Sequence, residues 1–306
     1  MLRRSRLGSV LTATAMTVAV AVGTAACGSG SAESSDRAPA GTIQVVTSTN
    51  VWGAVVAAVG GDAVSVRSLI DDPSADPHAY EVKPADATAI ADARLAVYNG
   101  GGYDDFFARL TETASGIRTI NAVDVAGKNA EGTNEHVWYD FASVRSVATT
   151  IADELGAIDP AHKDTFAGNA RTLGADLDAL TAKLAAVGAT HQGASFAATE
   201  PVADYLLEAA GLANATPRDF AEAIEEETDP SPAAVDETTT LVTEKKVLVL
   251  VTNIQTETPV TDALVEAARA AGVAVVEVTE TVPQNATGYL DWMTSQVDAL
   301  STATRG

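Results

Sequence analysis

The sequence has a single cysteine, only four histidines, and 19 lysines and arginines against 41 aspartates and glutamates in 306 residues. One cysteine cannot form an internal disulfide, so stability must come from core packing or from a bound ligand. The net charge of −22 at neutral pH opposes binding to nucleic acid and to anionic membrane surfaces, whereas it tolerates cations. We therefore expect no nucleic-acid partner.

The lone cysteine lies at the end of an N-terminal leader. Cys27 closes the run Thr24-Ala25-Ala26-Cys27, behind three arginines and the stretch 7–22, which is too short and too polar to predict a membrane-spanning helix. This arrangement indicates a bacterial lipoprotein signal in residues 1–26, so that Cys27 carries lipid and ties the chain to the outer face of the cell membrane. The alternative is an ordinary secretory signal with an incidental cysteine. The Gly/Ser-rich residues 27–41 are expected to form a flexible tether.

Beyond the leader, about 280 residues remain, enough for two ordinary domains, and their net charge is about −25 because the leader removes three arginines. Short apolar runs rich in β-formers alternate with alanine-rich helical stretches, which is the pattern of parallel βαβ units. The predicted strands are 43–49, 64–70, 95–98, 118–122, 194–199, 247–251 and 273–278. The predicted helices are 51–59, 84–92, 104–110, 141–155, 160–187, 202–210, 260–271 and 288–302.

One of these helices is exceptionally long. The apolar residues of 160–187 keep a helical spacing far beyond the usual length of about 11–12 residues. We therefore predict an α/β fold with two similar lobes, 42–159 and 188–306. Each lobe has a central, mostly parallel sheet flanked by helices, and the helix 160–187 joins them as a rigid spine.

Two histidines lie where ligands bind in open α/β sheets. His78 follows a predicted strand and His136 precedes a long helix, so both occupy loops at the ends of elements. Neutral imidazole binds transition metals near neutral pH, and together with carboxylates it suits Zn, Fe and Mn. By themselves, however, the two histidines are more often surface or hydrogen-bonding residues. His162 and His191 are interpreted as solvated surface residues.

Three segments give these histidines a context. They are Asp76-Pro77-His78-Ala79-Tyr80-Glu81, Val97-Tyr98-Asn99-Gly100 and Asn134-Glu135-His136-Val137-Trp138-Tyr139-Asp140. In order and spacing they resemble the motifs of the TroA-like solute-binding lipoproteins of zinc and manganese ABC importers, and the resemblance spans nearly the whole chain after the leader. It implies a non-enzymatic protein of two lobes joined by one helix. A single metal ion is held in the cleft and passed to an ABC permease and its ATPase.

The resemblance also implies four metal ligands. His78 matches the first ligand and His136 the second, both in the N-terminal lobe. Glu200 matches the third, although its charge could instead serve only to favour the following helix N-terminus. We favour the ligand because Pro201, in the first helical turn, leaves Glu200 at the carboxyl end of a strand.

The fourth ligand of the family is an acid after the last strand, and Glu280 occupies that place. Two nearby residues are alternatives to Glu280 as this ligand. Glu277 is three residues away, and an alignment shifted by one position would put Thr279 in this place. The run Glu225 to Glu227 is interpreted as a solvated face, because like charges repel and stay in water.

Two imidazoles and two carboxylates carry a charge near −2, which suits a divalent ion. We expect Zn²⁺ or Mn²⁺ as transported cargo of a monomer, with Fe²⁺ left open, since oxygen donors suit Mn²⁺ while the Irving–Williams order favours Zn²⁺. Two rival functions remain. One is a secreted zinc hydrolase with Glu280 as base, although the H-E-x-x-H and G-x-S-x-G motifs are absent. The other is a surface adhesin on the same fold.

Overall fold

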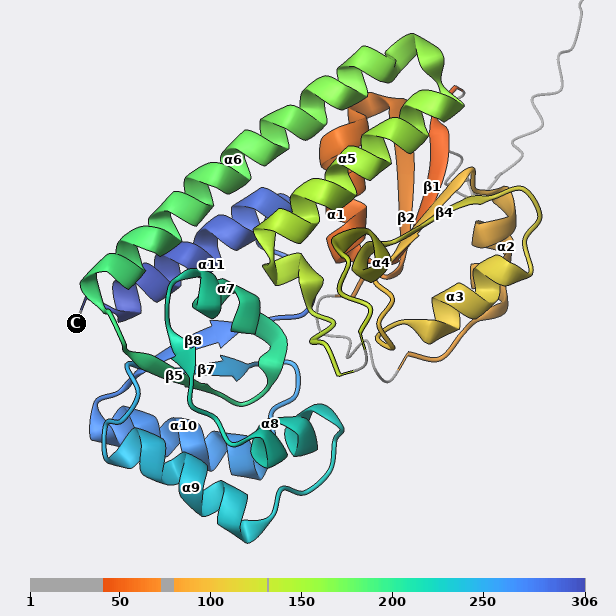
Figure 1. The fold of residues 1–306 in the computed structure, drawn as a ribbon. Helices are drawn as coiled ribbons and strands as arrows, with labels where there is room; N and C mark the ends of the chain where they lie inside the picture. Colours follow the sequence, from red (N-terminus) through yellow and green to blue (C-terminus); the bar gives the residue numbers. More distant parts are fainter. Residues whose placement is uncertain (1–40, 73–79, 131, 306) are drawn as a thin grey trace, which may run out of the picture. The chain divides into compact units, whose positions relative to one another are not determined.

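Four parallel strands form the sheet of the first lobe, in the order β2-β1-β3-β4. They are β1 (Ile43–Thr49), β2 (Val64–Ile70), β3 (Leu95–Tyr98) and β4 (Arg118–Asn121). The computed structural model of the chain describes residues 41–72, 80–130 and 132–305, all of which belong to one compact unit (Figure 1). β1 is buried along almost its whole length, as expected of a central parallel strand that is covered on both faces.

Helices cover both faces of this first sheet. On one face Val45 and Val97 pack in the same apolar cluster as α1 (Asn50–Gly60). On the other face Val46 and Ala96 pack with residues of α2 (Pro84–Asp92) and α3 (Asp105–Glu112). Successive strand residues therefore serve opposite cores, which is the period-2 pattern of a strand. The short helix α4 (Ala122–Ala126) follows β4 and contacts α5.

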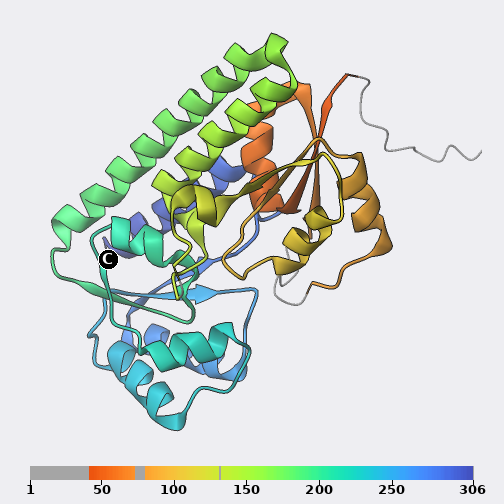
Figure 2. The ribbon, with the colours of Figure 1, turned by 45° about the vertical axis from the view of Figure 1, so that its right-hand side comes forward.

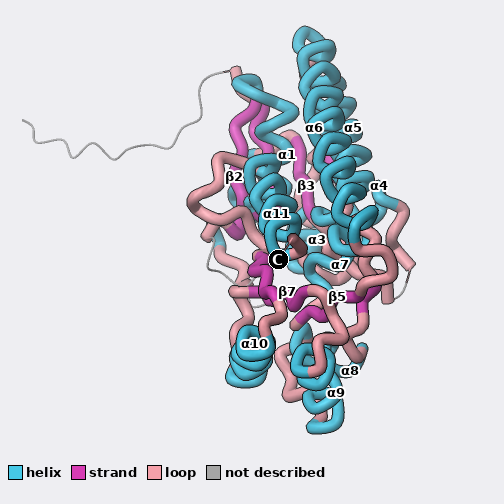
Figure 3. The backbone as a smooth tube through the Cα atoms, turned by 90° about the vertical axis from the view of Figure 1, so that its left-hand side faces the viewer, coloured by secondary structure: helices cyan, strands magenta, loops and turns pink. Residues whose placement is uncertain are grey.

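The second lobe repeats the same strand order, as β6-β5-β7-β8, again with every pair parallel. Its strands are β5 (Ser195–Ala198), β6 (Ala213–Asn214), β7 (Val249–Asn253) and β8 (Ala274–Val278). Its helices are α7 (Asp204–Ala209), α8 (Arg218–Glu225), α9 (Pro232–Thr243), α10 (Pro259–Ala271) and α11 (Tyr289–Ala303). Figure 3 shows α8, α9 and α10 on one side of this sheet and α7 and α11 on the other.

The two long helices α5 (Phe141–Ile158) and α6 (Lys163–Thr190) run side by side (Figure 2). α6 contacts α1 of the first lobe as well as α7 and α11 of the second. One apolar cluster runs from the strands of the first sheet through α5 and α6 to the strands of the second sheet. The lobes are therefore connected through a continuous core. Near the end of α6, Gly188 allows the helix to pack closely against the backbone of Ala210, because a Cβ at this position would lie 2.5 Å from the carbonyl oxygen of Ala210.

Hydrogen bonds also cross directly between the lobes. The side chain of Asn50 pairs with the backbone of Val282, donating from Nδ2 at 3.0 Å and accepting at Oδ1 at 2.9 Å. The Tyr139 hydroxyl donates to the carbonyl oxygen of Thr279 at 2.8 Å. Each bond fixes the position of a strand-end loop of one lobe against the other.

The predicted α/β fold, with two parallel sheets and a long helix, is confirmed. The long helix begins at Lys163 rather than at residue 160, because Pro160–His162 forms a separate 3₁₀ turn capped by Asp159. The lobe boundaries remain predictions, and the predicted leader and Cys27 lie outside the described residues. In the described part of the chain, no helix is both long enough and apolar enough to cross a membrane.

Candidate metal centre

Three buried polar residues meet at the carboxyl ends of β5, β7 and β8. Glu200 follows β5 and is 3% exposed, Asn253 ends β7, and Glu280 follows β8 and is 1% exposed. Because these strands are parallel neighbours, their carboxyl ends lie at the same edge of the sheet. Asn253 Nδ2 donates to Glu200 Oε2 at 2.7 Å and to Glu280 Oε1 at 2.8 Å. A single amide nitrogen thus holds the two carboxylates together.

Glu280 is also held from the first lobe. The Tyr103 hydroxyl donates to Glu280 Oε2 at 3.0 Å, and the backbone N–H of Glu280 donates to Gln255 Oε1 at 2.5 Å. Burial raises the pKa of Tyr103 well above its ordinary value, and the negative charge of Glu280 adds to this effect. Tyr103 therefore keeps its proton and remains a hydrogen-bond donor to the carboxylate.

The turn between β3 and α3 positions Tyr103. Asp104, which is 1% exposed, accepts hydrogen bonds from the backbone N–H groups of Asn99 and Gly100 at 2.7 Å each. Gly100 has a φ of +79°, and a Cβ there would overlap the side chain of Asn121, so this position requires glycine. Burial raises the pKa of the Asp104 carboxyl to about 6. This turn sets the place from which Tyr103 reaches the second lobe.

His136 is fully buried, and Asn134 fixes the protonation of its ring. Asn134 Oδ1 accepts from the backbone N–H of His136 and lies 2.8 Å from His136 Nδ1. The amide orientation follows from its nitrogen, because Asn134 Nδ2 donates to the carbonyl oxygen of Pro201 at 2.7 Å. An amide oxygen can only accept, so Nδ1 carries a proton, and Nε2 is the ring nitrogen on the side away from Asn134.

Glu225 lies beside this nitrogen, which the sequence interpretation did not foresee. Its Oε1 is 3.3 Å from His136 Nε2, and its side chain is 14% exposed. The interpretation of the acidic run as a solvated face is wrong for Glu225, although Glu226 and Glu227 are exposed. Glu225 is the last residue of α8 and lies one turn after the buried Ala221, on the flank of the face that packs against the sheet. Recognition of α8 as an amphipathic helix in the sequence would have indicated that Glu225 is partly buried.

Of the four predicted ligands, His136, Glu200 and Glu280 are buried, whereas His78 lies outside the described residues. Among the residues that the structure describes, no three His, Cys, Asp or Glu side chains are grouped closely enough to hold a metal ion. The structure therefore brings Glu200 and Glu280 together through Asn253, and it places His136 next to Glu225. His162, interpreted as a surface residue, is 54% exposed in its side chain and hydrogen-bonds to Asp159.

The chain just after His78 is fixed to the first lobe. The Tyr80 ring packs against Phe106 at a centroid distance of 4.9 Å, and its hydroxyl donates to Asp86 Oδ2 at 2.9 Å. The same carboxylate oxygen accepts from the backbone N–H of Lys83 at 2.7 Å. Tyr80 is thereby anchored to α2 and α3.

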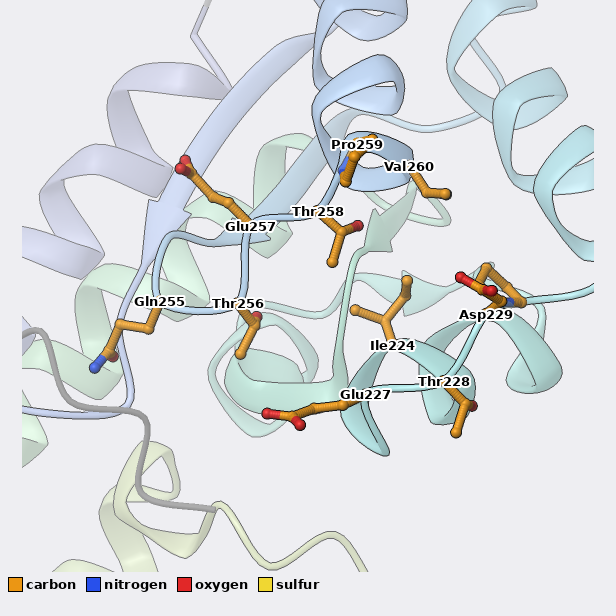
Figure 4. A pocket seen from close by; sticks show the side chains of 11 residues that line it. Ile224, Glu227, Thr228, Asp229, Gln255, Thr256, Glu257, Thr258, Pro259 and Val260 are labelled. Carbon is orange, nitrogen blue, oxygen red and sulfur yellow. The ribbon is translucent and has the colours of Figure 1, made fainter. Parts of the chain in front are cut away.

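A pocket of about 460 Å³ opens next to the centre in the second lobe (Figure 4). Gln255 and Thr256 line it from the loop after β7, and Glu227 and Asp229 line it from the segment after α8. Gln255 belongs to both places, because its Oε1 also accepts from the Glu280 backbone. The pocket therefore adjoins the buried polar cluster at Gln255.

The fold and these residues define a two-lobed α/β protein with two buried carboxylates at the carboxyl ends of strands of the second sheet and a buried imidazole in the first lobe. The chain belongs to the family described as "Zinc-uptake complex component A periplasmic", whose family model matches residues 45–303.

Similar proteins agree with this family. The manganese-binding lipoprotein MntA of Halalkalibacterium halodurans is 29% identical over 144 residues, which cover 45% of this chain and 47% of the relative. The metal ABC transporter substrate-binding lipoprotein ScbA of Streptococcus cristatus is 27% identical over 173 residues, covering 52% and 55%. The chain thus spans about half the length of the curated relatives it matches.

Solved structures match over a longer stretch. A mutant of the laminin-binding adhesin Lmb of Streptococcus agalactiae has a TM-score of 0.71 at 24% identity, covering 86% of this chain and 99% of that one. The solute-binding protein FpvC of Pseudomonas aeruginosa in complex with Mn²⁺ has a TM-score of 0.70 at 24% identity, covering 86% and 98%. At this identity the likeness establishes the fold.

Proposed function

We propose that the protein captures Zn²⁺ or Mn²⁺ outside the cytoplasm and delivers it as cargo to the permease and ATPase of an ABC importer. His78, His136, Glu200 and Glu280 bind the ion. Cys27 carries the lipid that holds the chain, as a monomer, at the outer face of the cell membrane. The family description supports this proposal, as do relatives named as metal-binding lipoproteins.

The observation that carries the proposal is the pair of buried carboxylates that share the Asn253 donor at the carboxyl ends of β5 and β8. Glu200 and Glu280 are almost inaccessible to solvent, and burying a carboxylate costs several kcal/mol unless its charge is balanced. Asn253 and Tyr103 are neutral donors that orient the carboxylates. A divalent cation would balance the charge of these oxygen donors, and the imidazole of His136 would supply a nitrogen donor.

Metal binding should involve small movements rather than a wide hinge. Asn50 and Tyr139 tie the lobes through strand-end loops, and the Tyr289 hydroxyl donates to the carbonyl oxygen of Trp138 at 2.6 Å. A wide opening would break these bonds and expose part of the shared apolar core. We therefore expect loop motion around the ion, with the lobes shifting slightly.

Calorimetric titration of the metal-stripped protein with Mn²⁺ and with Zn²⁺ tests the proposal. His78→Ala and His136→Ala should each abolish tight binding of both ions. His162→Ala changes an exposed histidine and serves as the matched control, which should bind as the parent does. Unchanged binding in the two ligand variants would remove this site from consideration.

The rival functions predict other results. A zinc hydrolase would show three protein donors and a water on the ion, next to a substrate pocket. An adhesin would lose attachment on deletion of the gene while metal uptake stayed intact. For the anchor, Cys27→Ser should move the protein from the membrane fraction to the medium.

A further inference from the structure

We propose that Lys128, Asn134 and Tyr205 form a latch between the two lobes, and that the lobes separate first along this edge, between α4 and α7. Lys128 and Asn134 lie in the first lobe, between α4 and the 3₁₀ turn Val137–Tyr139, and Tyr205 lies in α7 of the second lobe. The latch consists of protein groups alone, so it does not depend on the proposed ion.

Asn134 is bonded to the second lobe in both directions. Its Nδ2 donates to the carbonyl oxygen of Pro201 at 2.7 Å, and its own carbonyl oxygen accepts from the Tyr205 hydroxyl at 2.7 Å. Pro201 and Tyr205 flank the short corner through which β5 leads into α7. One residue of the first lobe is therefore bound to both ends of this corner.

Lys128 lies over the ring of Tyr205. Its Nζ is 4.1 Å from the ring centroid, which is a cation–π contact. The same Nζ is 3.4 Å from Asp140 Oδ2, and Asp140 caps α5 by accepting from the backbone N–H of Ala142 at 3.1 Å. The lysine is thus held between an anchored carboxylate of its own lobe and an aromatic ring of the other.

The Tyr205 hydroxyl stays a donor over the whole physiological range of pH. Burial raises the pKa of Tyr205 to about 12, and the negative charges of Asp140 and Glu208 add to this effect. The phenol therefore keeps its proton, and its bond to Asn134 is not broken by titration of this group.

The contacts of the latch can break without opening the shared core. Lys128 keeps 27% of its side chain exposed, and both hydrogen bonds of Asn134 are only partly buried, so water can replace the lost partners. The hydroxyl bonds of Tyr139 and Tyr289 are instead buried, and breaking them would leave polar groups without partners inside the protein. Separation of the lobes therefore begins at Tyr205.

The opposite side of the contact is held by apolar packing. Asn50 also bonds across the lobes, but it begins α1, and the next two residues, Val51 and Trp52, are fully buried in the apolar cluster that the lobes share. α1 also contacts α11 of the second lobe. Separation on this side would expose apolar surface to water, which is unfavourable. We expect this side to act as the pivot.

The test measures the distance between the lobes in the metal-stripped, full-length chain. Nitroxide labels are placed at Glu112→Cys in α3 and Glu237→Cys in α9, both exposed, in a Cys27→Ser background that contains no other cysteine. Tyr205→Phe removes only the hydroxyl of the latch. Lys128→Met removes its cation and keeps a long, unbranched side chain.

Both substitutions should add a population at longer distances in double electron–electron resonance. Backbone amide exchange in 132–136 and 201–206 should also rise by about fivefold or more, as expected from the loss of one hydrogen bond. The amides of α10, which lies outside the latch, should exchange as they do in the parent.

Tyr80→Phe and Lys183→Met are the matched controls. The Tyr80 hydroxyl donates to Asp86 within the first lobe, and Lys183 of α6 pairs with the exposed Asp298 of α11. Each control removes the same kind of group as its latch variant, and each should keep the parent's distance distribution.

Two results would overturn the inference. If Tyr205→Phe gives the same distance distribution and exchange as Tyr80→Phe, the hydroxyl does not hold the lobes together. If exchange rises to the same extent in α10 as in 201–206, Tyr205 stabilises the whole fold rather than this edge. Neither result bears on the proposed ion, because His136→Ala tests that proposal separately by metal titration.

Discussion

Asn253→Ala tests whether one amide holds the two carboxylates in place. The substitution removes the Nδ2 donor that lies 2.7 Å from Glu200 and 2.8 Å from Glu280. Hydrogen bonds to charged groups contribute about 1.5–3 kcal/mol each, so the metal-free protein should lose about 3 kcal/mol or more of unfolding free energy. Both carboxylates are buried, so water cannot replace the amide without opening the loops.

Urea unfolding of the metal-free and the metal-saturated protein measures this loss. The matched control is Asn129→Ala, an exposed asparagine that should change the unfolding free energy by less than about 0.5 kcal/mol. With Mn²⁺ or Zn²⁺ saturating, the loss at Asn253 should shrink, because the ion takes over the balancing of the two charges. A loss below about 1 kcal/mol without metal, or an equal loss with and without it, would refute the reasoning.

Three further predictions follow from the same structure. Tyr103→Phe removes the donor to Glu280 and should weaken metal binding by about tenfold while leaving the fold intact, as checked by calorimetry and circular dichroism; an unchanged affinity would show that this bond does not orient the carboxylate. Burial raises the pKa of the Asp104 carboxyl from 3.8 to about 6, so the folded protein binds this proton more tightly than the unfolded chain does. The parent's stability from this proton is complete below about pH 4 and is lost as the pH rises through 6. Asp104→Asn removes the titration, so the unfolding free energy of the variant minus that of the parent should increase by about 3 kcal/mol from pH 4 to pH 7, and a difference that stays constant would contradict the assignment. Within α6, Gly188→Ala should destabilise the protein by about 1–3 kcal/mol, because the new Cβ would meet the carbonyl oxygen of Ala210. Gly168→Ala has room for its Cβ and should stabilise the protein by about 0.5–1 kcal/mol. Thermal unfolding measures both changes, and a Gly188→Ala variant that is more stable than Gly168→Ala would refute the packing.

Much of the fold was predictable because its strands are short apolar runs with clear boundaries. The predicted strands 43–49, 64–70 and 95–98 coincide with β1, β2 and β3. The order of the strands within each sheet was not predictable, because it depends on tertiary packing rather than on local pattern.

The segment between β5 and β7 was the least predictable part. Its two-residue strand β6 is too short to show a period, and the helices α8 and α9 were not predicted. For α9 the signal was present, since Ser231 caps the helix through Ala234 N–H and Pro232 occupies its first turn. The same gap explains why Glu225 was interpreted as solvated.

For the centre, the resemblance to the TroA-like family implied that Glu200 and Glu280 lie together, and the structure brings them to one amide. The roles of Asn253 and Tyr103 could not be predicted, because nothing local distinguishes a buried amide or phenol that orients a carboxylate from one that only packs. The ligand set itself stays a prediction.

Anomalous diffraction at the manganese and zinc edges, from crystals of the metal-loaded protein, tests the central claim most directly. The account predicts one ion bound by His78, His136, Glu200 and Glu280, with donor distances of about 2.0–2.3 Å. An ion bound elsewhere on the chain, or crystals of the metal-loaded protein that show no ion beside His136, would contradict it.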